Sequence, residues 1–150
     1  MGKVLIVYHS LTGNTEEMAK AVAEGAKSVT DTEVVVKKAF DASADDLLSC
    51  DAAIFGTSTN FGYISGGLKD FFDRSLITCQ NKTEDKPYCG FTSSGMGKRK
   101  ALEILDGICG MGFKMKKADD GIVAQGKASA ETLEGLRQLG KKMAQAAVRK

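Results

Sequence analysis

The feature that most constrains this sequence is the alternation of short apolar runs with longer amphipathic segments. Apolar or β-branched runs lie at 3–9, 33–37, 51–56, 88–92 and 122–124. Two of them, the first and the third, are apolar without a polar residue at every second position. Such a run suits a strand that is covered on both faces, as in a parallel sheet. Five strands are therefore predicted.

The segments between the runs carry apolar residues at intervals of three and four. In the first of them, Met18, Val22 and Ala26 share one face, with Glu16 and Glu17 in the first turn. This periodicity is typical of an amphipathic helix, and acidic residues favour its start. The same pattern predicts helices over 15–27, 67–77, about 98–109 and from 129 through 143, with a poor helical turn at 45–49.

Strands that alternate with helices at this pitch indicate an α/β fold. They form right-handed βαβ units, so we expect a doubly wound parallel sheet of five strands with helices on both faces. A length of 150 residues fits one domain, and we expect residues 1–150 to form it. Ligands of such sheets bind beyond the carboxyl ends of the strands, where the winding reverses. The loops after strands one, three and four are therefore the candidate site.

Composition excludes several classes of function. A formal net charge of +2 gives no basic stripe for nucleic acid, and no strong field that would identify a protein partner. The N-terminal apolar run is too short for a signal sequence or a membrane span, so we expect a cytoplasmic protein. Cys50, Cys79, Cys89 and Cys109 lack metal-ligand spacing and are interpreted as reduced, packed thiols. With His9 as the only histidine, there is no candidate catalytic triad, and no metal site is expected.

The loop after the first strand is the most specific signal. It is rich in hydroxyls and leads directly into the first helix. Gly13 lets the backbone approach a ligand, and the helix start offers unpaired N–H groups and a favourable partial charge, so the loop can hold a phosphate without Lys or Arg. The alternative is an ordinary Ser- or Thr-capped helix. The loop consists of Ser10, Leu11, Thr12, Gly13, Asn14 and Thr15.

This loop resembles the phosphate loop of flavodoxins, whose pattern is Ser/Thr-x-Thr-Gly-x-Thr. Ser10, Thr12, Gly13 and Thr15 match every fixed position, and the likeness extends over the whole chain. The resemblance implies the flavodoxin-like strand order 2-1-3-4-5 and FMN as cofactor, with two further loops beside the flavin ring. These loops contribute Ser58, Thr59, Asn60, Phe61 and Gly62 on one side, and Ser93, Ser94 and Gly95 on the other.

The sequence also departs from the flavodoxin pattern. Asn60 occupies the position nearest to a common Trp, and either Phe61 or Tyr63 would stack on the ring. The third loop lacks the usual acidic residues and Tyr, and continues instead into Lys98, Arg99 and Lys100. If Lys98 or Arg99 reaches toward the ring, it stabilises the reduced anion and makes the potential less negative. The alternative is that both side chains form a solvated helix start.

Three functions remain open at this point. The first is a low-potential electron carrier that exchanges electrons with redox proteins, a reductase and an acceptor. The second is an FMN-dependent NAD(P)H:quinone reductase or a related enzyme, since the segment 63–73 resembles flavodoxin-like quinone reductases. The third is a binding module that has lost flavin, which the intact phosphate loop disfavours. The short chain favours an electron carrier without catalytic residues of its own.

Overall fold

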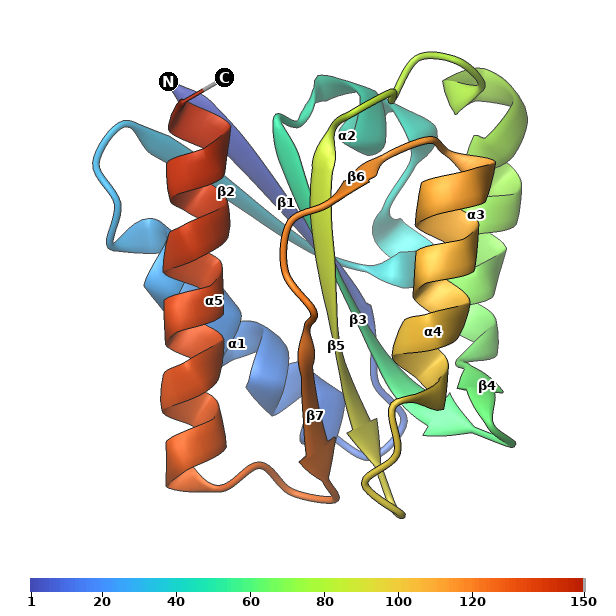
Figure 1. Cartoon of the computed structure of the whole chain (residues 1–150), viewed down its shortest axis with the longest axis vertical. Helices are drawn as coiled ribbons and strands as arrows, with labels where there is room; N and C mark the ends of the chain where they lie inside the picture. The colour runs from blue at the N-terminus through green and yellow to red at the C-terminus, as the bar shows by residue number, and fades with distance from the viewer. Residues whose placement is uncertain (150) are drawn as a thin grey trace.

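In the computed structural model, which describes residues 1–149, a twisted sheet lies between two layers of helices (Figure 1). The strands are β1 (Gly2–His9), β2 (Thr32–Lys38), β3 (Ala52–Asn60), β4 (Tyr63–Ile64), β5 (Pro87–Ser94), β6 (Lys116–Lys117) and β7 (Ile122–Gln125). The helices are α1 (Asn14–Lys27), α2 (Ala44–Ser49), α3 (Gly66–Cys79), α4 (Lys100–Asp106) and α5 (Ala130–Val148). A 3-10 turn spans Ala39–Asp41 and a π-helical turn spans Gly107–Gly112.

The order of the long strands confirms the predicted topology. Along the sheet the order is β2-β1-β3-β5-β6, and β7 also pairs with β5. All of these pairs are parallel. Since β6 and β7 together occupy the place of the predicted fifth strand, the arrangement is the expected 2-1-3-4-5.

The sheet nevertheless has seven strands rather than five, which corrects the prediction in two places. The fifth strand is split, because Pro87 and Tyr88 pair with β6 while the segment 91–94 of β5 pairs with β7. The short β4, which no sequence pattern predicted, pairs antiparallel with the end of β3. A two-residue strand has too little periodicity to be recognised in a sequence.

Two apolar cores, one on each face of the sheet, explain why the strand runs have no polar alternation. Val4 and Ile6 of β1 pack in the core beneath α1 and α5. Leu5 and Val7 pack in the opposite core, beneath α2, α3 and α4 (Figure 1). Successive side chains of a strand point to opposite faces, so a strand that is covered on both faces must be apolar at every position.

Helices α1 and α5 approach each other closely on their shared face. A Cβ atom at Gly25 would lie 1.7 Å from the carbonyl oxygen of Arg137, and one at Gly140 would lie 2.0 Å from that of Val22. Any larger residue at either position would therefore push the two helices apart. The contact holds α1, and with it the loop that precedes α1, against the sheet.

The helix predicted at 98–109 is shorter than expected. Helix α4 begins at Lys100 and ends at Asp106, and the chain then widens into the π-helical turn, where the N–H of Phe113 donates to the carbonyl of Ile108. Gly107, Gly110 and Gly112 lie in this turn. Glycine has low helix propensity and permits such widening.

The four cysteines are buried within the two cores, and none forms a disulfide with another. Burial raises the pKa of Cys50 to about 11, and it raises the pKa values of Cys79, Cys89 and Cys109 above their ordinary range as well. Thiols with raised pKa values are poor nucleophiles. No helix within residues 1–149 has the length and apolar character needed to cross a membrane.

Candidate functional site

The strand order brings the three predicted loops to one edge of the sheet. Strands β1, β3 and β5 are neighbours and run parallel, so the loops that follow their carboxyl ends meet at the edge drawn at the bottom of Figure 1. These loops contain every residue that was predicted from the sequence to bind a cofactor. The end of β7 lies at the same edge, beside the end of β5.

The side chain of Ser10 forms hydrogen bonds across the first loop. Its Oγ accepts hydrogen bonds from the N–H groups of Gly13, at 3.1 Å, and Glu16, at 3.2 Å. Gly13 adopts φ +98°, a left-handed conformation that glycine allows without strain. The N-cap residue of α1 is therefore Gly13 rather than a Ser or Thr, and Ser10 bonds to the start of the helix from three residues upstream. Its own hydroxyl hydrogen stays available, and Leu11 and Thr12 are exposed beside it while Asn14 is half-buried.

Thr15 connects the first loop with the third. Its side chain is buried, and its Oγ1 lies 2.8 Å from the Oγ of Ser93 at the end of β5. Either hydroxyl can donate in this pair. The two loops are thus joined beneath their exposed surfaces, and the hydroxyl of Thr15 forms part of the floor of the site.

The second loop is a tight hairpin between β3 and β4. Asn60 pairs with Tyr63, which leaves Phe61 and Gly62 as the two turn residues, with φ values of +54° and +71°. Asn and Gly are the residues that favour this turn, whereas an aromatic residue at positive φ is strained. The ring of Phe61 is nevertheless fully exposed, with 107% relative accessibility, so no packing within residues 1–149 offsets the strain.

Buried polar atoms without hydrogen-bond partners gather beneath the second loop. They are the Oγ of Ser58, the Oγ of Ser65 and the Nδ1 of His9. All three residues adjoin Thr57, which follows Gly56 in β3, pairs with His9 and accepts the N–H of Ser65 at 2.8 Å. A buried polar group without a partner is rare and costly unless a ligand or water satisfies it. In the same loop, the Oγ1 of Thr59 is satisfied by Thr92 at 2.8 Å.

The third loop is open and its backbone is accessible. Ser93 and Ser94 are buried, while Gly95 is exposed, with open space where a Cβ atom would lie. The Oγ of Ser94 accepts the N–H of Lys98 at 3.3 Å, and the carbonyl of Ser94 accepts the N–H of Gly97 at 3.1 Å. A planar ligand could therefore approach the Cα side of Gly95 closely, while the carbonyl of Gly95 accepts a hydrogen bond from the side chain of Gln125 at 3.4 Å.

The two cations for which the sequence left open a position near the ring or in solvent behave differently. The guanidinium of Arg99 donates to the carbonyl of Asp120, between β6 and β7, and is therefore directed to the edge of the sheet. Lys98 is exposed and forms no ion pair with any residue in the range 1–149. Of the two, only Lys98 retains a free side chain beside the third loop.

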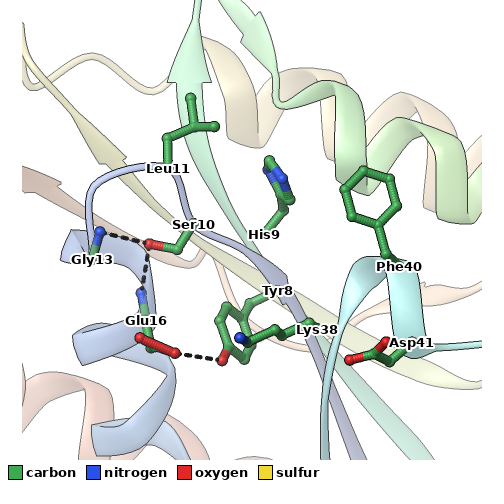
Figure 2. Close-up of a pocket in the computed structure, with 9 residues that line it drawn as sticks. All are labelled: Tyr8, His9, Ser10, Leu11, Gly13, Glu16, Lys38, Phe40 and Asp41. Atoms are coloured by element: carbon green, nitrogen blue, oxygen red, sulfur yellow. Dashed lines mark hydrogen bonds between the residues drawn. The ribbon is translucent and has the colours of Figure 1, made fainter.

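A groove on the β2 side of the first loop was not predicted from the sequence. It encloses about 480 Å³, and its lining includes three residues of the predicted site, Ser10, Leu11 and Gly13 (Figure 2). The other lining residues are Tyr8, His9, Glu16, Lys38, Phe40 and Asp41. No residue of the second or third loop lines it. No pattern in the sequence indicated this groove, to which Phe40, two residues after β2, contributes an exposed ring.

Two contacts between side chains hold four of the residues that line this groove in place. The hydroxyl of Tyr8 donates to Glu16 at 3.0 Å, and burial, together with this bond, raises the pKa of Tyr8 to about 12. The rings of His9 and Phe40 meet edge to face, with centroids 5.4 Å apart. Within residues 1–149, no group of three or more His, Cys, Asp or Glu side chains is placed to hold a metal ion.

Comparison with known proteins identifies the family. The family model described as flavodoxin matches residues 6–146. This chain belongs to the flavodoxin family. A flavodoxin from Aquifex aeolicus is 36% identical to it, over 97% of this chain and 86% of that protein. An archaeal flavodoxin structure superposes with a TM-score of 0.82 and 25% identity, covering 97% of this chain and 99% of that one.

A third relative is similar over a shorter stretch. An NAD(P)H dehydrogenase (quinone) from Acidithiobacillus ferrooxidans is 38% identical over 95 residues, which are 50% of this chain and 48% of that protein. The match over nearly the whole chain is therefore with flavodoxins, and this chain is an FMN-binding electron-transfer protein.

The residues present fit FMN. The hydroxyls and the helix start of the first loop suit a phosphate, the strained and bare Phe61 suits contact with a planar ring, and the unpartnered Oγ of Ser58 offers a polar partner beneath it. Bound FMN supplies the one- and two-electron redox chemistry. The protein contributes binding, orientation and a local field, and its own residues do not need to provide an acid or a base.

Proposed function

We propose that this chain is a low-potential cytoplasmic carrier that acts as one domain over residues 1–150 and passes electrons between a reductase and an acceptor protein. The proposal rests on the structure of the first loop, residues 10–15. There the Oγ of Ser10 accepts the N–H groups of Gly13 and Glu16, and the segment 10–15 carries no charged side chain. The first loop holds the phosphate without Lys or Arg, so it brings no positive charge near the flavin. It therefore does not stabilise the negatively charged reduced flavin, which keeps the reduction potential low.

We assign the parts of FMN to the three loops as follows. The segment 10–15 holds the phosphate through its hydroxyls and the amides of the first turn of α1. The segment 58–62 lies beside the ring, with Phe61 as the exposed aromatic. The segment 93–95 presents its backbone to the pyrimidine edge, where Gly95 leaves room for a close approach.

A titration of apoprotein into FMN, followed by quenching of flavin fluorescence, tests these assignments. Riboflavin, which lacks the phosphate, is the comparison ligand. We expect near-stoichiometric binding of FMN and weak binding of riboflavin. The Ser10→Ala variant should weaken FMN binding roughly tenfold, as expected for the loss of one hydrogen bond to a charged group, and leave riboflavin unchanged.

Ser43→Ala is the matched control, because Ser43 begins α2 with a capping box and lies outside the three loops. It should leave both dissociation constants unchanged. Equal affinity of the wild-type protein for FMN and riboflavin would contradict the role of the first loop. Absence of quenching by either ligand would contradict the assignment of all three loops.

A second candidate function rests on the partial match with an NAD(P)H dehydrogenase (quinone). The loaded protein would then oxidise NAD(P)H in the presence of a quinone. We expect no steady oxidation by the isolated protein, and reduction only when a reductase is added. Sustained turnover without a reductase would favour the enzyme over the carrier.

A further inference from the structure

The loops at the flavin edge differ in charge from the rest of the chain. Four segments meet there: 10–15, 58–65, 93–100 and 125–129. Together they contain four of the 21 Lys and Arg residues and none of the 19 Asp and Glu residues. The whole chain has a formal net charge of only +2, so the remainder is net negative. This edge is therefore basic although the net charge of the whole chain is close to zero.

The cations of this edge are Lys98, Arg99, Lys100 and Lys127. The N–H of Gly126 donates to the carbonyl of Ser94 at 3.1 Å, which places the segment that carries Lys127 beside the third loop. Lys100 is 3.9 Å from Glu103, and Arg99 is bound to a carbonyl. Lys98 and Lys127 are exposed, and neither forms an ion pair within residues 1–149.

Exposed apolar side chains lie at the same edge of the sheet. Leu11 of the first loop and Met96, directly after Gly95 of the third, are exposed by 63% and 75%, whereas the ring of Phe61 is assigned to the flavin. The carboxylates nearest in sequence, Glu16, Glu17 and Glu131, lie in the first turns of α1 and α5 rather than in the loops. An apolar centre with a charged rim is typical of protein interfaces in which the rim steers association.

We propose that this edge, defined by Leu11, Met96, Lys98 and Lys127, is the docking surface for a redox protein whose own electron-transfer site is surrounded by acidic residues. The proposal rests on the proposed function, because it requires electron exchange with a protein. Free cations at the edge raise the local concentration of an acidic partner, and they orient it with its redox centre toward the flavin. A basic partner is repelled from the same surface.

Binding to two probe proteins tests the proposal. The FMN-loaded protein is titrated at low salt with an acidic plant-type [2Fe–2S] ferredoxin, and separately with a basic c-type cytochrome, while amide chemical shifts are followed by NMR. We expect shifts at Met96, Lys98 and Lys127 with the ferredoxin alone. Its affinity should fall roughly tenfold when the ionic strength rises from about 20 to about 300 mM, because salt screens exposed charges.

Charge-matched variants separate the local effect from net charge. Lys98→Gln with Lys127→Gln removes two free cations from the edge and should weaken ferredoxin binding roughly tenfold at low salt. Lys82→Gln with Lys141→Gln removes two exposed cations elsewhere, after α3 and on α5, and should change the affinity less than twofold.

The outcomes distinguish this proposal from the proposed function. If the wild-type protein binds FMN but prefers the cytochrome, or if salt and the edge variants have no effect, the docking surface is overturned and the carrier function stands. Shifts at the same amides produced by NADPH, with none produced by the ferredoxin, would overturn an acidic protein as the occupant. Failure to bind FMN would overturn the proposed function first.

Discussion

The hydroxyl oxygens of Thr15 and Ser93 lie 2.8 Å apart, although 78 positions separate the two residues in the chain. Both side chains are buried. Their hydrogen bond joins the first turn of α1 to the end of β5. It is thus a direct side-chain link between the first and the third of the predicted loops.

Replacing Thr15 with Val tests this coupling. The change keeps the shape of the side chain but leaves the buried Oγ of Ser93 without a partner, which should lower the free energy of unfolding by about 1–3 kcal/mol. Urea denaturation of the apoprotein measures the loss. The double variant Thr15→Val with Ser93→Ala removes both groups and should recover part of that loss. Strictly additive losses would show that the two hydroxyls do not interact.

The hairpin turn predicts opposite effects on stability and on binding. Asn tolerates positive φ far better than Phe, so Phe61→Asn should stabilise the apoprotein by up to about 1 kcal/mol. The same change should weaken FMN binding, because the exposed ring is lost. Thermal unfolding and the fluorescence titration measure the two effects. Tyr63→Leu is the comparison: if it weakens FMN binding while Phe61→Asn does not, Tyr63 is the residue that stacks on the ring.

Lys98 should set part of the flavin potential. Its free side chain lies beside the third loop, so Lys98→Gln should make the two-electron potential more negative by roughly 20 mV, after allowance for solvent screening. Arg99→Gln is the matched control, because the guanidinium of Arg99 is bound to the carbonyl of Asp120. Redox titration against reference dyes measures both variants. Equal shifts, or none for Lys98→Gln, would contradict the distinction between the two cations.

Asp46 should make stability depend on pH in the acid range. Burial raises its pKa, but the ion pair with Lys37, at 2.9 Å, and the N–H of Ser43 outweigh burial, so the net pKa lies below its ordinary value of 3.8. A lowered pKa in the folded state stabilises the fold above the unfolded value, and this contribution is lost as the pH falls through the folded value.

Asp46→Asn should therefore cost about 1 kcal/mol at pH 7, as expected for the loss of a helix-capping group, and much less near pH 2. Urea denaturation at the two pH values gives the difference. Asp45→Asn, an exposed neighbour in the same turn, should have little effect at either pH. A cost for Asp46→Asn that is the same at both pH values would contradict the argument.

The sequence was most informative where one physical rule dominates. A strand that is buried on both faces must be apolar throughout, so β1 and the first part of β3 were predicted within one or two residues. The amphipathic period likewise predicted α1 and α5. Ser10, Thr12, Gly13 and Thr15 were sufficient to indicate the family, because a phosphate loop combines residue type with strict spacing.

The features that were missed depend on contacts between distant segments. The bond between Thr15 and Ser93 and the groove that contains Phe40 arise only when separate loops meet in space. The split of the fifth strand could not be predicted from local sequence either. Lys116 and Lys117 are not apolar, and they pair with β5 through the backbone alone. Arg99 was expected to behave like Lys98, but its partner is a carbonyl that no sequence pattern indicates.

The split fifth strand also determines what this edge of the sheet offers to a strand of another molecule. β6 offers only two consecutive residues, both lysines, and the chain leaves the edge of the sheet before it returns as the four-residue β7. An incoming strand from another molecule would find a short, charged and interrupted row of backbone groups. Such an edge resists the strand-to-strand pairing that begins aggregation. The opposite edge, β2, is an unbroken strand of seven residues, so this resistance is a property of the edge formed by β6 and β7.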